Sequence, residues 1–306
     1  NQHWQQAQVP VQTTITAVNF VDENTVWAVG HQGVILKSND AGQTWVKNFD
    51  GLDLVELLRT GLEQQIAILT PALEAEEDSD RYDELEMQLD DATYKLEDLT
   101  AGSGIEIALF DVRFLTPQLG FVIGAYGTML KTTDGGKNWQ FVGFNVPNPD
   151  GLHLNAFATA ADNLFVVGEA GFAMRTSDDG MNWQRLDIDY QGSLFGMQGN
   201  EQVVYTYGLR GNMFASKDAG DSWQRVDTGI TNHIFAADWL SGNELLLVGA
   251  GGLKLIYDGQ AFANISRAAY RVDLTAVKIL DDNVLTSSLD GWQLTTLAET
   301  VRGDGK

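Results

Sequence analysis

Cysteine is absent from this chain of 306 residues, and proline and basic side chains are scarce. Without cysteine, the chain has no disulfides, thiolate metal ligands or cysteine nucleophiles. Because 19 Lys and Arg stand against 42 Asp and Glu, the formal charge is −23, which argues against nucleic acid or an anionic membrane surface as partner. No run of 18 apolar residues occurs, so we expect no direct insertion into a membrane.

Glycine is abundant instead, with 32 residues against five prolines, and hydrophobic residues make up 44% of the chain. This composition predicts a sizeable core and many tight turns. The sequence begins at Asn1 with a polar stretch that runs to Gln8. We interpret this start as a mature terminus left by signal-peptide cleavage, which predicts an exported, periplasmic protein; trimming of the chain is the alternative interpretation.

One motif is repeated along the chain. Four segments follow the pattern Ser/Thr-x-Asp-x-Gly-x-x-Trp, known as the Asp box. Their Asp and Trp residues are Asp40 and Trp45, Asp134 and Trp139, Asp178 and Trp183, and Asp218 and Trp223. Gly-x-x-Gly turns precede the boxes and begin at residues 30, 124, 168, 208 and 249, with a degenerate copy at 288. After the first interval the spacing is about 40 residues, the period of a β-propeller blade with four short strands.

The repeat predicts an all-β fold, a six-bladed β-propeller; a seventh blade would need a unit that the sequence does not show. In each box, Gly tolerates positive φ, Asp and Ser/Thr bind turn amides, and Trp packs on the neighbouring blade. Because each Asp lies in a different blade, no two can share a cation, and we expect no metal and no cofactor. The segment His3–Gln6 resembles a strand that follows a box, so we expect Trp4 and its neighbours to close the ring as the fourth strand of the last blade.

The first interval between turns is 94 residues, and residues 51–104 supply the excess. They contain no box, and their apolar residues follow a heptad rhythm, which predicts an antiparallel helical hairpin. Pro71 is expected to kink or end the first helix. The predicted domains are a propeller formed by residues 1–50 and 105–306 and an inserted, coiled-coil-like acidic hairpin formed by residues 51–104.

The hairpin carries about half of the net charge, with 15 acidic and three basic residues between Leu52 and Thr100. Several of its apolar residues lie outside the heptad seam: Leu54, Leu57, Ile66, Ile68 and Met87. Two helices cannot bury all of them, so they pack on the propeller or on a partner, and the sequence favours neither alternative. The acidic residues either keep an exposed hairpin soluble or attract a basic partner.

The hairpin belongs to a connection between blades, so we expect it on the same face as the Gly-x-x-Gly turns. Loops on a rigid scaffold often carry recognition, which makes this face the predicted partner-binding surface. The further candidate residues on it are His31, Tyr126, Glu169, Arg210, Arg267 and Arg271.

The sequence contains no catalytic constellation. The four histidines have no ligand spacing, and there is no nucleophile elbow or phosphate loop. Asp boxes occur in sialidases, whose chemistry needs an Arg cluster, an acid/base Asp and a Tyr nucleophile. Six arginines are available for such a cluster, but no early Arg-Ile-Pro motif accompanies them: Arg113, Arg175, Arg210, Arg225, Arg267 and Arg271. A carbohydrate-binding or sialidase-like glycoside hydrolase propeller therefore stays as the alternative function.

The repeats in Trp27–Trp45 and Val122–Trp139 resemble those of the photosystem II stability/assembly factor-like propellers. This resemblance implies an exported, non-enzymatic accessory protein that binds membrane-protein subunits during assembly. A bacterial, non-photosynthetic member would be an accessory subunit of a membrane complex such as a resistance-nodulation-division (RND) exporter. The chain departs from the family in its hairpin, in six rather than seven units, and in lacking the basic patch of the photosynthetic members. Self-association through the hairpin is a third interpretation.

Overall fold

The computed structural model describes residues 5–100, 106–266 and 272–302. The chain divides into two compact units, Asn1–Gly151 and Leu152–Lys306. Each unit consists of antiparallel sheets in which consecutive strands are neighbours. The six sheets are the blades of a β-propeller, with a helical hairpin inserted after the first blade, as the repeat predicted. The candidate residues Arg267 and Arg271 lie outside the described residues.

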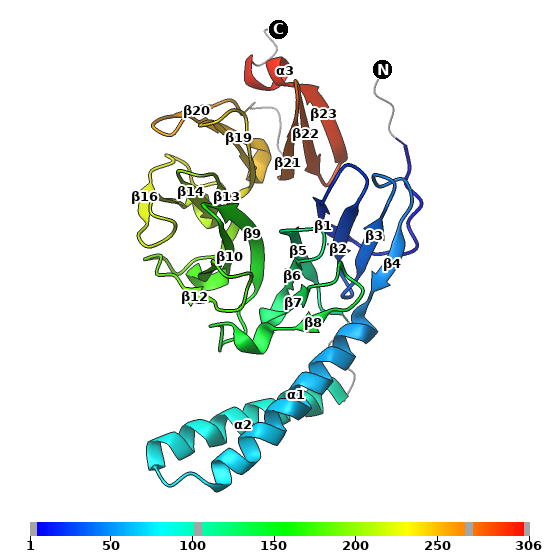
Figure 1. The fold of residues 1–306 in the computed structure, drawn as a ribbon. Coiled ribbons are helices and arrows are strands. Elements are labelled where there is room, and N and C mark those ends of the chain that lie inside the picture. Colours follow the sequence, from blue (N-terminus) through cyan, green and yellow to red (C-terminus); the bar gives the residue numbers. More distant parts are fainter. Residues whose placement is uncertain (1–4, 101–105, 267–271, 303–306) are drawn as a thin grey trace. The chain divides into compact units, whose positions relative to one another are not determined.

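The first unit contains two four-stranded blades and the hairpin (Figure 1). The first blade is formed by β1 (Ile15–Phe20), β2 (Val26–Gly30), β3 (Ile35–Ser38) and β4 (Val46–Phe49). The hairpin is formed by α1 (Gly51–Glu74) and α2 (Ser79–Thr100). The second blade is formed by β5 (Leu109–Phe114), β6 (Gly120–Gly124), β7 (Met129–Thr132) and β8 (Gln140–Phe141).

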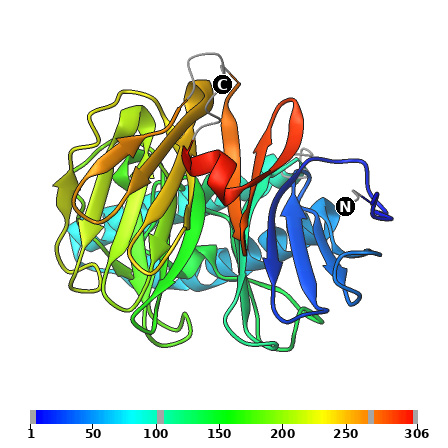
Figure 2. The same ribbon diagram turned by 90° about the horizontal axis from the view of Figure 1, so that it is seen from above.

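The second unit contains three four-stranded blades and one with three described strands. The four-stranded blades are β9 (Leu154–Ala160), β10 (Asn163–Gly168), β11 (Ala173–Thr176) and β12 (Gln184–Arg185); β13 (Leu194–Gly199), β14 (Val204–Gly208), β15 (Met213–Ser216) and β16 (Gln224–Val226); and β17 (Ile234–Trp239), β18 (Leu245–Gly249), β19 (Leu253–Tyr257) and β20 (Phe262–Asn264). The last blade has β21 (Leu274–Leu280), β22 (Asn283–Ser288) and β23 (Gly291–Thr296), followed by α3 (Leu297–Arg302), which packs against β22 and β23 (Figure 2).

The position of each strand in its blade follows from its sequence. The second strands are short, almost wholly apolar runs such as Val26–Gly30 and Gly120–Gly124, and every residue in these two is buried. Such runs suit a strand covered on both faces. The fourth strands are two to four residues long and mostly exposed. The first strands of neighbouring blades pack side by side within each unit: β1 with β5, and β9, β13, β17 and β21 in succession.

An aromatic cluster joins the two blades of the first unit. Trp27 of β2 stacks on Phe114 of β5, with ring centroids 4.9 Å apart, and the Trp139 ring meets both edge-on. Trp139 Nε1 also donates a hydrogen bond to Asn48 Oδ1 of the first blade, at 2.8 Å. Here the box Trp packs on the neighbouring blade, as expected, whereas Trp45 packs within its own blade, against Ala28 and Leu36.

Beyond residue 4, the N-terminal segment pairs with the first blade, and the core of the expected closing strand lies outside the described residues. Trp4 lies outside the described residues, but Gln8 forms a parallel bridge with Thr44, in the first blade. The Gln8 N–H donates to Gln43 O, and the Trp45 N–H donates to Gln8 O, both at 3.1 Å. Within the described residues, the last blade has no fourth strand.

The hairpin begins with a capping box, in which the Asp50 side chain accepts from the Leu52 and Asp53 amides and Asp53 accepts from the Asp50 amide. The helix does not end at Pro71, one of the two outcomes expected there, because α1 continues to Glu74. Pro71 lies in the last turn, where the missing amide costs a single helical hydrogen bond. Leu62 and Leu69 of α1 and Leu85 and Ala92 of α2 are buried in the seam between the helices.

Candidate functional site

The Asp-box carboxylates are fully used by their own turns. Asp40 Oδ1 accepts from the Ser38 hydroxyl at 2.7 Å and from the Thr44 amide at 2.9 Å, and Oδ2 accepts from the Thr44 hydroxyl. The same network recurs around Asp134, Asp178 and Asp218. These hydrogen bonds, chiefly from the residue four positions on, lower the pKa of each of the four carboxyls from 3.8 to about 2. The residues that the structure describes contain no cluster of three potential metal ligands.

The third residue of the Gly-x-x-Gly turns lies in the left-handed region. In four of them the third residue has φ between 51° and 60°: Gln32, Tyr126, Ala170 and Arg210. Such residues are strained unless the surroundings hold them. At Arg210 a hydrogen bond stabilises this conformation. The Arg210 N–H donates to Nδ1 of His233, in the connection to the next blade, at 3.0 Å.

The first glycine of each turn is required by a close approach. A Cβ on Gly168 would lie 2.1 Å from His153 O, and the same clash recurs at Gly30, Gly124, Gly208 and Gly249. That carbonyl, just before the first strand of the blade, accepts the N–H of the residue after the glycine. The turns therefore form a rigid face within each unit.

The candidate residues on this face fall into separate groups. His31 and Tyr126 lie in the first unit, where the Tyr126 side chain is exposed. In the second unit, Glu169 Oε1 accepts from the His153 amide at 2.9 Å and lies 3.7 Å from His153 Nδ1. His233 was not among the predicted residues of this face, and its ring lies beside the rings of Phe195 and Phe235.

Among the arginines considered for a glycosidase, Arg175 is used in contacts between neighbouring blades. Arg175 forms an ion pair with Asp221 of the next blade and donates to Ala219 O and to Gln184. The hydroxyl of Tyr190, a tyrosine in the same unit, donates to Leu209 O at 3.2 Å, and burial raises the pKa of this phenol. Arg175 and Tyr190 thus each contact a neighbouring turn.

The base of the hairpin is anchored on the first unit. Leu54 is fully buried in the cluster that contains Trp27 and Phe114, and Leu57 packs against it. A Cβ on Gly61 would lie 2.8 Å from the Phe144 ring, so α1 lies directly on the segment after β8. Leu54 is therefore inaccessible to a partner, and for this residue packing on the propeller is the correct alternative.

The outer part of the hairpin is exposed. Ile66 is half-buried, whereas Ile68, Met87 and Tyr94 have exposed fractions of 69%, 67% and 69%. Met87 and Tyr94 are one heptad apart on α2, so they share one face, about 10.5 Å apart along the axis. The same face carries exposed carboxylates at neighbouring helical positions: Asp80, Asp83, Glu84, Asp90, Asp91, Glu97 and Asp98.

Few cations neutralise this face. On α2, Arg81 pairs with Glu84 and Lys95 with Asp91, both at 2.6 Å, and the sequence has no other basic residue in the helix. Two large exposed apolar side chains among carboxylates make this face of α2 a candidate for recognition of a partner. None of the described helices is both long and apolar enough to cross a membrane.

Residues 1–62 and 89–196, more than half of the chain, match the family model of the photosynthesis system II assembly factor YCF48. The chain belongs to this family. YCF48 from Cyanidioschyzon merolae superposes with a TM-score of 0.51 at 16% identity, over 61% of this chain and 66%, just under two thirds, of that one. The WD40 repeats of RRP9 superpose with a TM-score of 0.61 at 9% identity, over 95% of this chain and 78% of that one.

At these identities the solved structures support the propeller fold alone. A structure of YCF48 bound to D1 peptide shares 16% identity over 97% of this chain and 95% of that one, but its TM-score of 0.46 carries no argument about this chain. No curated protein matches the sequence. The match to the YCF48 family model leaves two parts of the chain uncovered: residues 63–88, the distal part of the hairpin and its tip, and residues 197–306. The distal hairpin therefore interrupts the matched part of the chain.

Proposed function

We propose that this chain is a non-enzymatic assembly factor that binds a membrane-protein partner, and that the exposed face of α2 contacts it. The observation that carries this proposal is the pair Met87 and Tyr94, exposed one heptad apart among carboxylates. Membership of a family of assembly factors supports a binding role. The anchored base supports it too, because a rigid arm loses less conformational freedom on binding than a mobile one.

The charge of the arm defines the chemistry of the partner. A segment that carries Lys or Arg around two apolar side chains complements α2, because the cations meet the carboxylates while the apolar groups cover Met87 and Tyr94. Attraction of this kind accelerates association and weakens as salt rises. Pairing of two hairpins is disfavoured, since both would bring the same sign of charge.

We propose further that the protein is exported to the periplasm and that its client is an RND-type exporter. The family resemblance supports both points. The experiment therefore uses membranes of the native host, so that any integral membrane protein can be recovered and identified.

The test places a photo-crosslinking residue at position 87 or, as matched control, at position 68 of the full chain. Ile68 is equally exposed but lies on α1. We expect position 87 to crosslink one membrane protein, and Met87→Ser with Tyr94→Ser to reduce its recovery at least about tenfold, a loss of about 1.4 kcal/mol. Raising the salt from 50 to 500 mM should weaken recovery further.

Equal crosslinking from positions 87 and 68, or equal recovery by the serine variant, would show that α2 is not the contact. A hairpin–hairpin crosslink between two copies would support self-association instead. Cleavage of a fluorogenic glycoside, or binding on a glycan array, would favour the hydrolase or carbohydrate-binding alternative.

A further inference from the structure

Among the described strands, β23 is the outermost strand of the last blade. Within the described residues this blade has three strands, whereas the other five blades have four, which leaves β23 at the edge. The fourth strands of the other blades are two to four residues long, and three of them carry Lys47, Arg185 or Arg225. Natural edges are blunted by shortness and charge. β23 is six residues long and uncharged, with the sequence Gly-Trp-Gln-Leu-Thr-Thr.

The backbone of β23 offers hydrogen bonds on its free side. The Leu297 N–H donates to Asp282 O at 2.7 Å, in register with the pairing of Thr296 with Asn283. Because hydrogen-bonding direction alternates along an antiparallel strand, the amides of Trp292 and Leu294 point away from β22. The Thr296 N–H follows this rule, as it donates to Glu299 Oε2 instead. The Trp292 side chain is 59% exposed.

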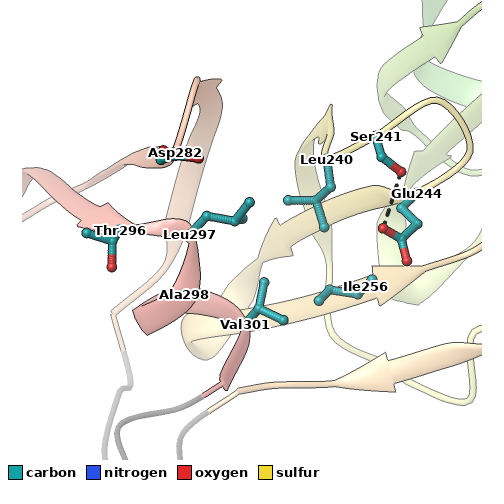
Figure 3. A pocket seen from close by; sticks show the side chains of 9 residues that line it. All are labelled: Leu240, Ser241, Glu244, Ile256, Asp282, Thr296, Leu297, Ala298 and Val301. Carbon is teal, nitrogen blue, oxygen red and sulfur yellow. Dashed lines mark hydrogen bonds between the residues drawn. The ribbon is translucent and has the colours of Figure 1, made fainter.

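A groove of about 750 Å³ lies beside the end of this strand (Figure 3). Leu297 and Val301 of α3 point across it toward Leu240 and Ile256 of the preceding blade. The other lining residues are Ser241, Glu244, Asp282, Thr296 and Ala298. Both charged side chains in the lining are carboxylates, and both are exposed.

The groove is open because α3 follows the third strand, where four of the other five blades have the Asp box. In the first unit, the chain after β7 forms the box turn, and Trp139 then fills the space against Trp27 and Phe114. In the last blade, the residues after β23 form α3, and no Trp follows. Among the residues that the structure describes, the last blade thus has neither a box Trp nor a fourth strand.

We propose that β23 and this groove bind an extended segment of a partner protein by strand addition. An aromatic or large apolar side chain of the segment enters the groove, and Lys or Arg beside it face Glu244 and Asp282. Charge complementarity selects this occupant, since a second copy of the chain would bring its own excess of carboxylates. The proposal does not depend on the hairpin surface.

Binding is tested on the full chain with a labelled hexapeptide, acetyl-Lys-Trp-Gln-Arg-Val-Lys-amide, by fluorescence anisotropy. Trp292→Pro removes an outward amide at an edge position where proline is tolerated, and it leaves the net charge unchanged. We expect this variant to weaken binding at least about tenfold. Leu289→Ala, at a 91% exposed side chain outside the groove, is the matched control and should bind as the parent does.

Three peptide variants separate the contributions. Proline in place of Gln removes a strand donor, alanine in place of Trp removes the anchor, and glutamate in place of Lys and Arg reverses the charge; each should bind about tenfold more weakly. The chain with Met87→Ser and Tyr94→Ser should bind the hexapeptide normally, which separates this site from the hairpin. Circular dichroism of Trp292→Pro confirms that the variant is folded, and Val301→Glu gives a second test within the groove.

Equal affinity of the parent and of both groove variants would overturn the proposal. Binding that appears only after deletion of residues 1–9 would mean that the N-terminal segment occupies the edge. Dimers of the parent that Trp292→Pro converts to monomers would mean that a second copy does.

Discussion

Gly136→Ala should be among the most destabilising single-methyl additions in the first unit. Gly136 has φ of 77°, and a Cβ built on it would lie 2.1 Å from Cη2 of Trp27. Trp27 cannot move aside, because its ring is stacked on Phe114 and met edge-on by Trp139. Left-handed backbone costs an L-residue about 1–2 kcal/mol. Overpacking a filled core costs a further ~1–3 kcal/mol, so we expect a loss of about 2–5 kcal/mol.

The chain supplies matched controls at the same position of other boxes. Gly42 has φ of 86°, but its nearest neighbour would be 3.5 Å away, so Gly42→Ala should cost only the backbone strain of about 1–2 kcal/mol. Gly220 is intermediate, with φ of 95° and the Phe165 ring at 3.0 Å. The predicted order of destabilisation is Gly136→Ala, then Gly220→Ala, then Gly42→Ala.

Urea unfolding followed by tryptophan fluorescence measures this order, with the slope checked for constancy among variants. Equal losses for Gly42→Ala and Gly136→Ala would refute the reasoning, because the box glycine would then serve its own turn and not the contact between blades.

The remaining predictions concern the box carboxylates and the hairpin base. Because the pKa of Asp178 is lowered from 3.8 to about 2, its contribution to stability is complete above about pH 4 and is lost as the pH falls toward 2. The Tm difference between the parent and Asp178→Asn should therefore shrink over that range, and a constant difference would contradict the assignment. Leu54→Ala should lower the free energy of unfolding by about 2–5 kcal/mol and speed amide exchange in α1. Ile68→Ala should change the free energy of unfolding by less than about 0.5 kcal/mol. Equal effects of the two substitutions would show that Leu54 does not anchor the hairpin.

The blades were predictable because their signals are local. The Asp box and the Gly-x-x-Gly turn each need particular residues within a few positions, such as Asp40 for the turn amides and Gly30 for the approach of Thr14 O. The hairpin was predictable from the heptad spacing that buries Leu85 and Ala92. These patterns depend on contacts between residues close in sequence, or on a strict period.

The features that sequence alone left open depend on distant contacts. The heptad pattern could not tell whether Leu54 meets the propeller or a partner, because Trp27 and Phe114 belong to other elements. The hydrogen bond between the Arg210 amide and His233 joins residues 23 positions apart without a motif. The hydrogen bonds between Gln8 and residues 43–45 likewise join segments that are far apart in sequence, and no short motif predicts them.

The degenerate repeat at the end of the chain links sequence to the open edge most directly. Ser288 stands where the other turns begin with glycine, and the segment after β23 has helix-forming residues where a box would have Asp and Gly. A box turn leads the chain back along the third strand, whereas α3 leads it away and leaves the Trp292 and Leu294 amides without a neighbour on that side among the described strands. The loss of the Asp box in the last repeat therefore also explains why β23 has no described neighbour on that side. If the last repeat had lost its box but kept a fourth strand, that strand would cover β23 and close the groove. The edge of β23 is therefore open because α3 begins directly after it.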